Sequence, residues 1–114
     1  MWIRRKVKPG HQLGRKLGHP TINFNVGSFA LHRQPGVYSC EVKIHGKIYR
    51  GALYFGPKLA RPGLALEIYV LDYSGNLYGQ YINFKVGKKI RKPKRFDSPE
   101  ALKKQIQEDV ARIV

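Results

Sequence analysis

The chain has 114 residues, of which 42% are hydrophobic and 25% are charged. That length suits one domain with a single core, here residues 1–114, and that composition excludes a disordered chain. Basic residues outnumber acidic ones by 22 to 7, and the resulting formal charge of +15 predicts an anionic partner such as a nucleotide, a nucleic acid or an acidic membrane.

Cysteine content and hydropathy favour a cytoplasmic protein. Cys40 is the only cysteine, so no internal disulfide can form and no oxidising compartment is required. The first residues lack the apolar segment of a signal peptide, and no apolar run approaches the roughly 18 residues of a membrane span. The four histidines have no Cys or acidic neighbours at ligand spacing, which argues against a zinc site.

Short strand patterns begin the chain. Residues 2–8 alternate apolar and basic side chains until Pro9-Gly10 ends the pattern. After a glycine-containing segment, residues 22–26 alternate with period two, which puts the apolar side chains on one face and Asn23 on the other. Residues 27–36 contain Gly, Ser and Pro, and this predicts a loop long enough to cover a ligand.

A hairpin is predicted next. Residues 37–44 alternate cleanly, His45-Gly46 is a tight-turn signal, and residues 47–55 return as the partner strand. Gly51 inside that partner strand predicts a bulge or a close approach of another segment.

The second half continues with strands. Residues 57–63 read as a loop, and residues 64–73 are the most apolar run and predict a central strand. After a turn, residues 77–86 form another predicted strand, and Gly87 begins a basic loop that runs to residue 95.

One helix is predicted, at the end of the chain. Asp97 or Ser98 can act as its N-cap, and Pro99 suits its first turn. Apolar residues recur at helical spacing at Leu102, Ile106, Val110 and Ile113. Five or six short strands joined by turns and followed by one helix predict an antiparallel barrel with a terminal helix.

The segment from Gly14 to Gly18 can bind an anion. Two glycines four residues apart allow backbone amides to approach a phosphate, and Arg15 and Lys16 between them supply positive charge. An ordinary surface turn would show the same local pattern, so this pattern alone leaves both interpretations open.

Thr21 and Asn23 form a candidate cation site. Pro20 fixes the backbone before them, and in an extended segment their side chains point to the same side. A hydroxyl and an amide oxygen are ligands that Mg²⁺ accepts when nucleotide phosphates complete its shell. Two unrelated polar surface residues are the alternative.

Glu67 is a carboxylate inside the most apolar strand. Desolvation would raise its pKa, whereas a neighbouring cation or hydrogen-bond donors would lower it. The functional interpretation is a general base, and the structural one is an ion pair with a nearby Lys or Arg.

Taken together, these motifs resemble the riboflavin kinase family, a module also found at the C-terminal end of bacterial bifunctional FAD synthetases. The resemblance covers nearly the whole chain, and its specificity comes from the order and spacing of many short matches. The matching segments are Gly14-Arg15, Leu17-Gly18, Pro20-Thr21-Ile22-Asn23, Pro35-Gly36-Val37-Tyr38, Leu66-Glu67-Ile68, Leu71-Asp72, Leu77-Tyr78-Gly79, Ile90-Arg91 and Phe96-Asp97-Ser98, followed by Leu102 and Asp109.

The resemblance implies a mainly β fold, a six-stranded antiparallel Greek-key-like barrel with a C-terminal α-helix. It also implies transfer of the γ-phosphoryl of ATP to the 5′-hydroxyl of riboflavin, with Mg²⁺, to give FMN and ADP. Phosphoryl transfer is mostly positioning and charge neutralisation, so a glycine loop, one metal and one base suffice without a Walker sequence.

Carried over by position, the resemblance implies that Glu67 is the base at the riboflavin hydroxyl and that Thr21 and Asn23 hold Mg²⁺. The implied ATP-binding residues, at the phosphates and on the adenine side, are Gly10, Gly14, Arg15, Gly18, Val70, Asp72 and Tyr78. The implied flavin-binding residues, in the basic loop before the helix, are Arg91, Lys94 and Phe96.

The chain departs from the family pattern in two places. After Gly56 the family usually has a short Pro-Thr segment, whereas this chain carries residues 57–63, and Tyr54 stands where an Asn is common. No nucleotidyltransferase domain precedes the barrel, so we expect no synthesis of FAD from FMN. The sequence is compatible with a stand-alone enzyme and with an excised module.

Two other functions are weighed against the kinase. The charge permits a small barrel that binds single-stranded nucleic acid, but the seven tyrosines are more easily interpreted as strand residues. A flavin-binding relative without turnover conflicts with the intact Thr21, Asn23 and Glu67. We therefore expect a monomer whose partners are riboflavin and ATP, with nucleic acid disfavoured and no membrane partner.

Overall fold

The computed structural model describes residues 1–8, 21–58, 62–73, 75–94 and 98–113. Within these residues the secondary structure is mainly β, with one short 3₁₀ helix and one α-helix. The elements are β1 (Ile3–Lys6), β2 (Thr21–Phe24), the 3₁₀ helix η1 (Gly27–Leu31), β3 (Gly36–Ile44), β4 (Lys47–Pro57), β5 (Leu64–Val70), β6 (Tyr81–Arg91) and α2 (Pro99–Ile113).

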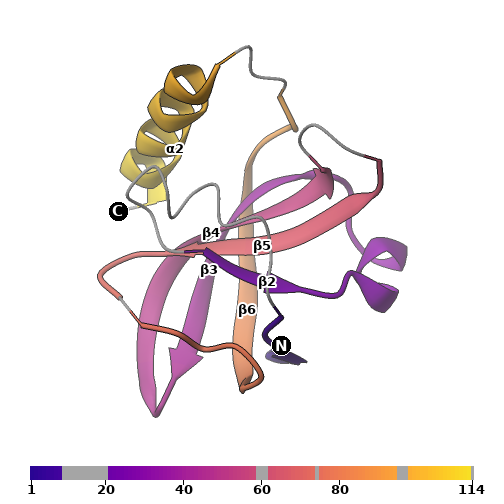
Figure 1. Ribbon diagram of the computed structural model, residues 1–114, viewed down its shortest axis with the longest axis vertical. Coiled ribbons are helices and arrows are strands. Elements are labelled where there is room, and N and C mark those ends of the chain that lie inside the picture. Colours follow the sequence, from indigo (N-terminus) through magenta and orange to yellow (C-terminus); the bar gives the residue numbers. More distant parts are fainter. Residues whose placement is uncertain (9–20, 59–61, 74, 95–97, 114) are drawn as a thin grey trace.

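The strands form one curved antiparallel sheet in the order β1-β6-β3-β4-β5-β2. Its two edge strands approach each other just after β1, where the Lys8 N–H donates to the Asn23 carbonyl at 2.8 Å. Figure 1 shows how the sheet wraps around itself and how α2 lies across one end. The predicted mainly β, six-stranded antiparallel fold with a C-terminal helix is therefore confirmed.

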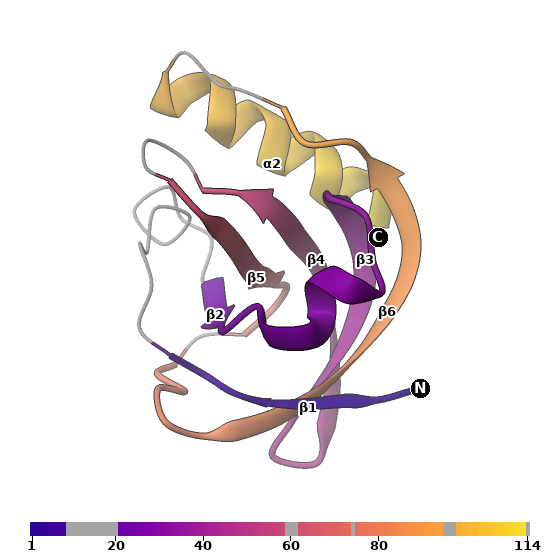
Figure 2. The ribbon, with the colours of Figure 1, turned by 90° about the vertical axis from the view of Figure 1, so that its right-hand side faces the viewer.

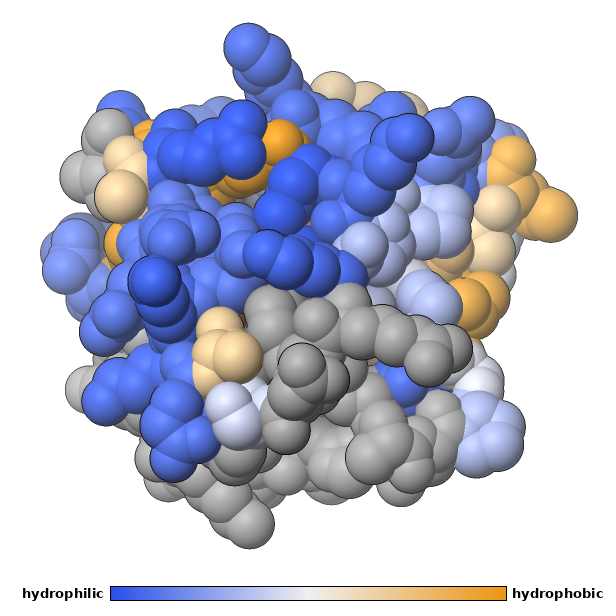
Figure 3. Space-filling view, turned by 90° about the horizontal axis from the view of Figure 1, so that it is seen from above, coloured by the Kyte–Doolittle hydropathy of each residue, from blue (hydrophilic) through white to orange (hydrophobic). Residues whose placement is uncertain are grey.

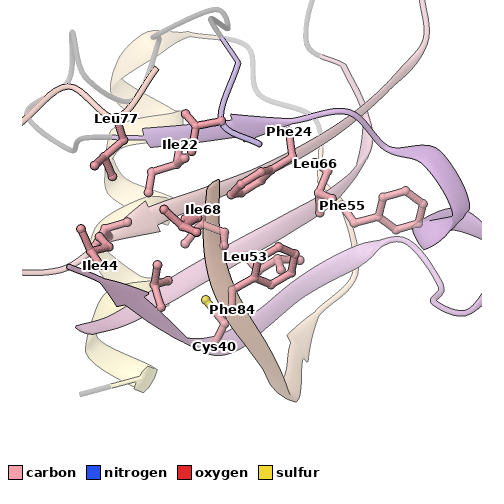
Figure 4. Packing of buried hydrophobic residues seen from close by; sticks show 14 of the residues in the cluster. Ile22, Phe24, Cys40, Ile44, Leu53, Phe55, Leu66, Ile68, Leu77 and Phe84 are labelled. Carbon is pink, nitrogen blue, oxygen red and sulfur yellow. The ribbon is translucent and has the colours of Figure 1, made fainter. Parts of the chain in front are cut away.

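The core lies inside the curved sheet. Apolar side chains from alternate strand positions meet there, because successive residues of a strand point to opposite faces. The Phe24 and Phe84 rings pack at 5.2 Å between centroids, and Figure 4 shows how they lie among neighbours from several strands. Residues buried in this cluster include Ile22, Phe24, Cys40, Ile44, Leu53, Phe55, Leu66, Ile68, Leu77 and Phe84. The remaining strand positions face outward and are available for function.

Helix α2 covers part of the outer face of the sheet. Its Ile106 is buried against Val37, Ala52 and Tyr69, which come from β3, β4 and β5. The hydroxyl of Ser98 accepts a hydrogen bond from the Ala101 N–H at 3.2 Å, as an N-cap does. The predicted cap at Ser98 is confirmed, whereas its alternative Asp97 lies outside the described residues. No helix in the described part of the chain is long and apolar enough to cross a membrane.

The predicted loop over residues 27–36 is partly wrong. Its first half is the 3₁₀ helix η1, in which the Phe29 N–H donates to the Val26 carbonyl at 3.0 Å. Phe29 is buried and packs edge-on against Phe55, with ring centroids 5.2 Å apart. An apolar side chain that reaches the core thus holds this segment in a helical turn, which local Gly and Pro content does not predict.

The predicted basic loop that begins at Gly87 is also partly wrong, because β6 continues to Arg91, and of the described residues only 92–94 lie outside regular structure. The pairing of β6 with β3 shifts register twice in this region, which bends the strand without ending it. Ser39 stabilises the bend by accepting a hydrogen bond from the Lys88 N–H at 2.9 Å. A Cβ at Gly87 would lie 2.5 Å from the Ser39 hydroxyl oxygen and 3.1 Å from the Ser39 carbonyl oxygen, so glycine suits this close approach of the two strands.

Other strand boundaries differ by a few residues. β4 extends to Pro57, β5 ends at Val70 before a turn in which Asp72 has φ 60, and β6 begins at Tyr81 instead of residue 77. Gly51 pairs regularly on both sides, so no bulge occurs there. The alternative prediction of a close approach is confirmed, since a Cβ at Gly51 would lie 2.8 Å from both Ile68 Cγ2 and the Tyr69 carbonyl oxygen.

Candidate active site

One row of paired residues crosses the outer face of the sheet and joins several predicted site residues. Asn23 on β2 is opposite Glu67 on β5, which is opposite Tyr54 on β4. Tyr54 is in turn opposite Val37 on β3, and Val37 is opposite Arg91 on β6. Since neighbouring strands are about 4.8 Å apart, Glu67 and Arg91 are separated by roughly 14 Å along the sheet. We call these five residues the site row.

Glu67 lies near the middle of the outer face and is partly buried. Burial raises the pKa of its carboxyl group, and a hydrogen bond from the Tyr69 hydroxyl partly offsets this. The oxygen atoms of that bond are 3.3 Å apart, which is long for a hydroxyl donor, so burial dominates. The sequence left the direction of this shift open, and a raised pKa makes Glu67 a better proton acceptor once it is ionised.

Two tyrosines beside Glu67 were not predicted to belong to the site. Burial raises the pKa of both Tyr54 and Tyr69, and the negative charge of Glu67 adds to the shift in each case. Both phenols are therefore protonated at neutral pH and act as donors. Tyr69 donates to Glu67, whereas Tyr54 donates to the Pro57 carbonyl at 2.6 Å.

Thr21 and Asn23 share the outer face of β2, opposite Tyr69 and Glu67 respectively. Asn23 is 7% exposed, and its Nδ2 is the one buried side-chain polar atom in the described residues without a hydrogen-bond partner. Such an atom needs an explanation, because buried polar groups are normally paired. A half-turn of the amide exchanges its nitrogen and oxygen, which places an acceptor oxygen in that position.

The donor set at this place fits a hard cation. The Thr21 hydroxyl and the Asn23 amide offer neutral oxygen atoms next to the Glu67 carboxylate across the pair of strands. In the described part of the chain, no group of three or more His, Cys, Asp or Glu side chains could hold a metal ion. A metal at Thr21 and Asn23 would therefore need further oxygen ligands from a bound nucleotide.

Arg91 ends the site row and is held by α2. Its guanidinium makes two hydrogen bonds to Asp109, with Nε to Oδ1 at 2.8 Å and Nη2 to Oδ2 at 2.9 Å. Asp109 also accepts from Gln105 Nε2 at 3.0 Å, and Lys94 Nζ donates to Gln105 Oε1 at 3.3 Å. This chain of contacts joins Arg91 and Lys94, two of the three predicted flavin-binding residues, through one helix.

The sequence pattern does not single out Gln105, and it includes Asp109 only as part of the family resemblance. The four-residue spacing of Gln105 and Asp109 could have indicated that they act together, since residues four apart on a helix lie on one face. The side chain of Asp109 is only 4% exposed and that of Arg91 16%, so this is a largely buried bidentate pair.

The predicted adenine-side residues do not lie on the site row. The Val70 side chain is buried in the core, so only its main chain is available to a ligand. Asp72 is exposed in the turn after β5, and Tyr78 is partly buried at the edge of the core, where its N–H donates to Asn76 Oδ1 at 2.9 Å. The other predicted contacts lie outside the described residues, namely Gly10, Gly14, Arg15, Gly18 and Phe96.

Cys40 is excluded as a nucleophile. It is buried in the core, and burial, with a smaller contribution from Glu41, raises the pKa of its thiol to about 12. The reactive thiolate is therefore nearly absent at neutral pH.

Figure 3 shows the molecule from above, where hydrophilic side chains cover most of the surface that is not drawn in grey. A ligand that approaches this face of the molecule would therefore meet mainly charged and polar side chains.

The whole chain, residues 1–114, matches the family model described as Flavokinase: Riboflavin kinase. The chain belongs to the riboflavin kinase family. A bifunctional riboflavin kinase/FMN adenylyltransferase of Haemophilus influenzae is 38% identical over 112 residues, covering 92% of this chain and 35% of that protein. An RNA-binding riboflavin kinase of Bacillus subtilis, RibR, is 36% identical over 112 residues, covering 96% and 48% respectively.

A solved structure of a riboflavin kinase from Trypanosoma brucei has the same fold. It superposes with a TM-score of 0.65 at 25% identity, covering 98% of this chain and 76% of that one. The chain thus spans about half of one curated relative and about a third of the other. The family resemblance in the sequence is confirmed.

Proposed function

We propose that this riboflavin kinase family member transfers the γ-phosphoryl group of ATP to the 5′-hydroxyl of riboflavin, in the presence of Mg²⁺, and releases FMN and ADP. The observation that carries this proposal is the site row, which aligns a partly buried carboxylate with a candidate cation site on one side and a helix-bound arginine on the other. Membership of the family supports the choice of substrates.

In the proposed reaction, Glu67 accepts the proton of the riboflavin 5′-hydroxyl. The hydroxyl oxygen forms a bond to the γ-phosphorus, the bond from that phosphorus to the bridging oxygen breaks, and ADP leaves with the electron pair. Tyr69 holds the Glu67 carboxylate in place through its hydroxyl. Thr21 and Asn23 would hold Mg²⁺, which when bound neutralises charge on the phosphates.

The remaining contacts are positional. Arg91 and Lys94, with Phe96, would hold the flavin nucleotide, and Asp109 orients Arg91 from α2. We assign the ATP phosphates to Gly10, Gly14, Arg15 and Gly18. We assign the adenine side to the main chain of Val70 and to Asp72 and Tyr78. The lone buried cysteine is consistent with a reducing, cytoplasmic setting for this chemistry.

A single assay tests the proposed function. Purified protein is incubated with riboflavin, ATP and Mg²⁺, and flavins are separated by chromatography, with matched reactions lacking ATP or containing a chelator. We expect FMN in equal amount to the ADP formed and none in either control. No FMN with any nucleoside triphosphate, with Mg²⁺ or Mn²⁺, would reject kinase activity. Flavin binding without turnover would then indicate an inactive relative.

Removing the proposed cation ligands should weaken metal-dependent nucleotide binding without unfolding the protein. Thr21→Ala removes the hydroxyl and Asn23→Ala removes the amide, and neither contributes to the core. We expect the Mg²⁺ concentration for half-maximal activity to rise roughly 10-fold or more. A 10-fold rise corresponds to a loss of about 1.4 kcal/mol of binding free energy, the size expected for one charge-assisted contact. Excess Mg²⁺ should partly restore turnover.

Asn25→Ala is the matched control, because Asn25 is exposed and offers only its backbone carbonyl to Arg5. Its Mg²⁺ dependence should equal that of the parent protein. If Asn23→Ala lowers the melting temperature and leaves the Mg²⁺ dependence of the folded fraction unchanged, the amide has a structural role only.

A further inference from the structure

A second outward surface of the sheet lies away from the site row. It belongs to the segment around β1 and to β3 and β6, and Figure 2 shows β1 at the end of the molecule opposite to α2. Its side chains alternate with inward-facing ones such as Val42, Ile82 and Phe84, so they point outward. We call it the basic-aromatic face, and it comprises Trp2, Arg4, Lys6, Lys43, Tyr81 and Lys85.

The two aromatic residues of this face are exposed and surrounded by cations. Trp2 retains 37% and Tyr81 58% of its surface. Lys43 Nζ lies 4.7 Å from the centroid of the Trp2 ring, and Arg4 Cζ lies 4.7 Å from that of Tyr81. Because β6 separates β1 from β3, the contact between Lys43 and Trp2 crosses a whole strand. Neither aromatic residue belongs to the buried core.

The charge of these strands is strongly one-sided. β1, β3 and β6 together contain eight basic residues and one acidic residue, Glu41. Glu41 is opposite Lys85 on one side and Arg50 on the other, so a basic residue flanks it on both neighbouring strands. The surplus positive charge of the basic-aromatic face is left for a partner.

We propose that the basic-aromatic face binds single-stranded nucleic acid, a function separate from phosphoryl transfer. Lys and Arg side chains contact the phosphates, while Trp2 and Tyr81 stack on bases, the combination by which open sheet faces bind single strands without sequence preference. An anionic membrane is less suited to this face, since membrane insertion needs clustered apolar side chains instead of rings paired with cations.

The sequence pattern disfavours nucleic acid, because the seven tyrosines are more easily interpreted as strand residues. Most of them are at least partly buried, but Tyr81 is exposed at the start of β6, next to Lys6 in register. The exposure of one tyrosine and of the N-terminal tryptophan depends on the strand order, which the sequence pattern does not show.

Trp2 provides a direct readout because it is the only tryptophan. Titration with an oligouridine of about 12 nucleotides, within the site sizes of single-strand binders, should quench its emission as bases stack. Inorganic polyphosphate of similar charge tests attraction without bases and should cause little quenching. Oligothymidine of the same length tests whether the sugar matters. Saturating ATP should leave oligouridine binding unchanged, because the kinase site is elsewhere.

Variants separate stacking from charge, with affinity measured by anisotropy of a labelled oligouridine. Tyr81→Ala should weaken binding roughly 5- to 150-fold, and Tyr81→Phe, which keeps the ring, should bind almost normally. Lys43→Gln should weaken binding and reduce the slope of log affinity against log salt by about 0.7, as expected for one lost phosphate contact. Lys103→Gln removes one positive charge from the exposed side of α2, and it should change neither the affinity nor the salt slope.

The proposal is overturned by any of four results. The first is no binding at low salt, and the second is binding that Tyr81→Ala leaves intact and polyphosphate matches, which would indicate charge alone. The third is displacement by ATP, which would place the oligonucleotide in the kinase site. The fourth is preferential quenching by anionic vesicles, which would assign the face to a membrane instead. Phosphorylation of riboflavin by Tyr81→Ala should equal that of the parent protein, which keeps this test independent of the proposed kinase.

Discussion

Glu67→Gln is expected to reduce turnover of riboflavin by roughly 10²- to 10⁴-fold, the usual contribution of a positioned general base. Glutamine keeps the shape of the side chain and can still accept the hydrogen bond from Tyr69, but it cannot accept a proton. Binding of riboflavin and ATP should be nearly unchanged, because the other residues of the site row are intact. Single-turnover rates measured alongside equilibrium binding of both substrates check this expectation.

The stability of the same variant tests the alternative that Glu67 is only a structural ion-pair partner. Burial raises the pKa of Glu67 above its ordinary value of 4.5. Folding therefore favours the neutral carboxyl over the ionised one, relative to the unfolded chain. This favourable contribution is complete below about pH 4.5 and is lost as the pH rises through the raised pKa. Near neutral pH, Glu67→Gln should be at least as stable as the parent protein.

Glu41→Gln is the matched control, since Glu41 is an exposed strand carboxylate away from the site row. It should retain full turnover. A Glu67→Gln protein that unfolds easily but turns over normally would assign Glu67 to structure. A stable variant with full turnover would remove it as the base and leave positioning as the source of catalysis.

Asp109→Ala is expected to cost about 3 kcal/mol of unfolding free energy, with a fall in melting temperature on the order of 10 °C. The change leaves the Arg91 guanidinium, whose side chain is 16% exposed, without its bidentate partner, and it leaves Gln105 without an acceptor. The cost lies at the lower end for a broken buried pair, because Arg91 can still turn toward water. Denaturant unfolding measures it.

The same variant should raise the KM for riboflavin more than it lowers kcat, because Asp109 positions Arg91 and does not touch the reacting atoms. Asp109→Asn keeps one acceptor oxygen for Arg91 and should recover part of both losses. Glu108→Ala, at the neighbouring exposed position of α2, should be neutral within about 0.5 kcal/mol. If Asp109→Ala loses stability but retains the parent KM, Arg91 does not contribute to flavin binding.

Most of the fold could be predicted from the sequence because it follows from period-two patterns. The alternation around Glu67 places Leu66 and Ile68 in the core and leaves Glu67 outside it, as the structure shows. The errors arise where a tertiary contact overrides a local signal. Gly87 reads as the start of a loop, but it lets β6 pass close to Ser39, and Phe29 turns a predicted loop into a 3₁₀ helix by reaching the core.

The residues of the candidate site are visible in the sequence, but their arrangement is not. Glu67, Asn23 and Arg91 are each visible in the sequence, yet their alignment depends on which strands are neighbours and in which register. The raised pKa of Glu67 depends on burial around it, which the sequence alone does not determine. The contact between Arg91 and Asp109 requires the helix to return to the end of β6.

The strand order also has a consequence for how the chain folds. β1 pairs with β6, and Ile3 is opposite Phe84, so the sheet closes only after nearly the whole chain is available. Such non-local pairing slows folding to roughly the millisecond-to-second range, and strands whose inner face belongs to the unfinished core are exposed meanwhile, β5 among them. That strand, LALEIYV, has the composition of an aggregation-prone segment, and Glu67 is its one charge. The same carboxylate then acts as a gatekeeper, and Glu67→Gln should aggregate more during refolding at high protein concentration.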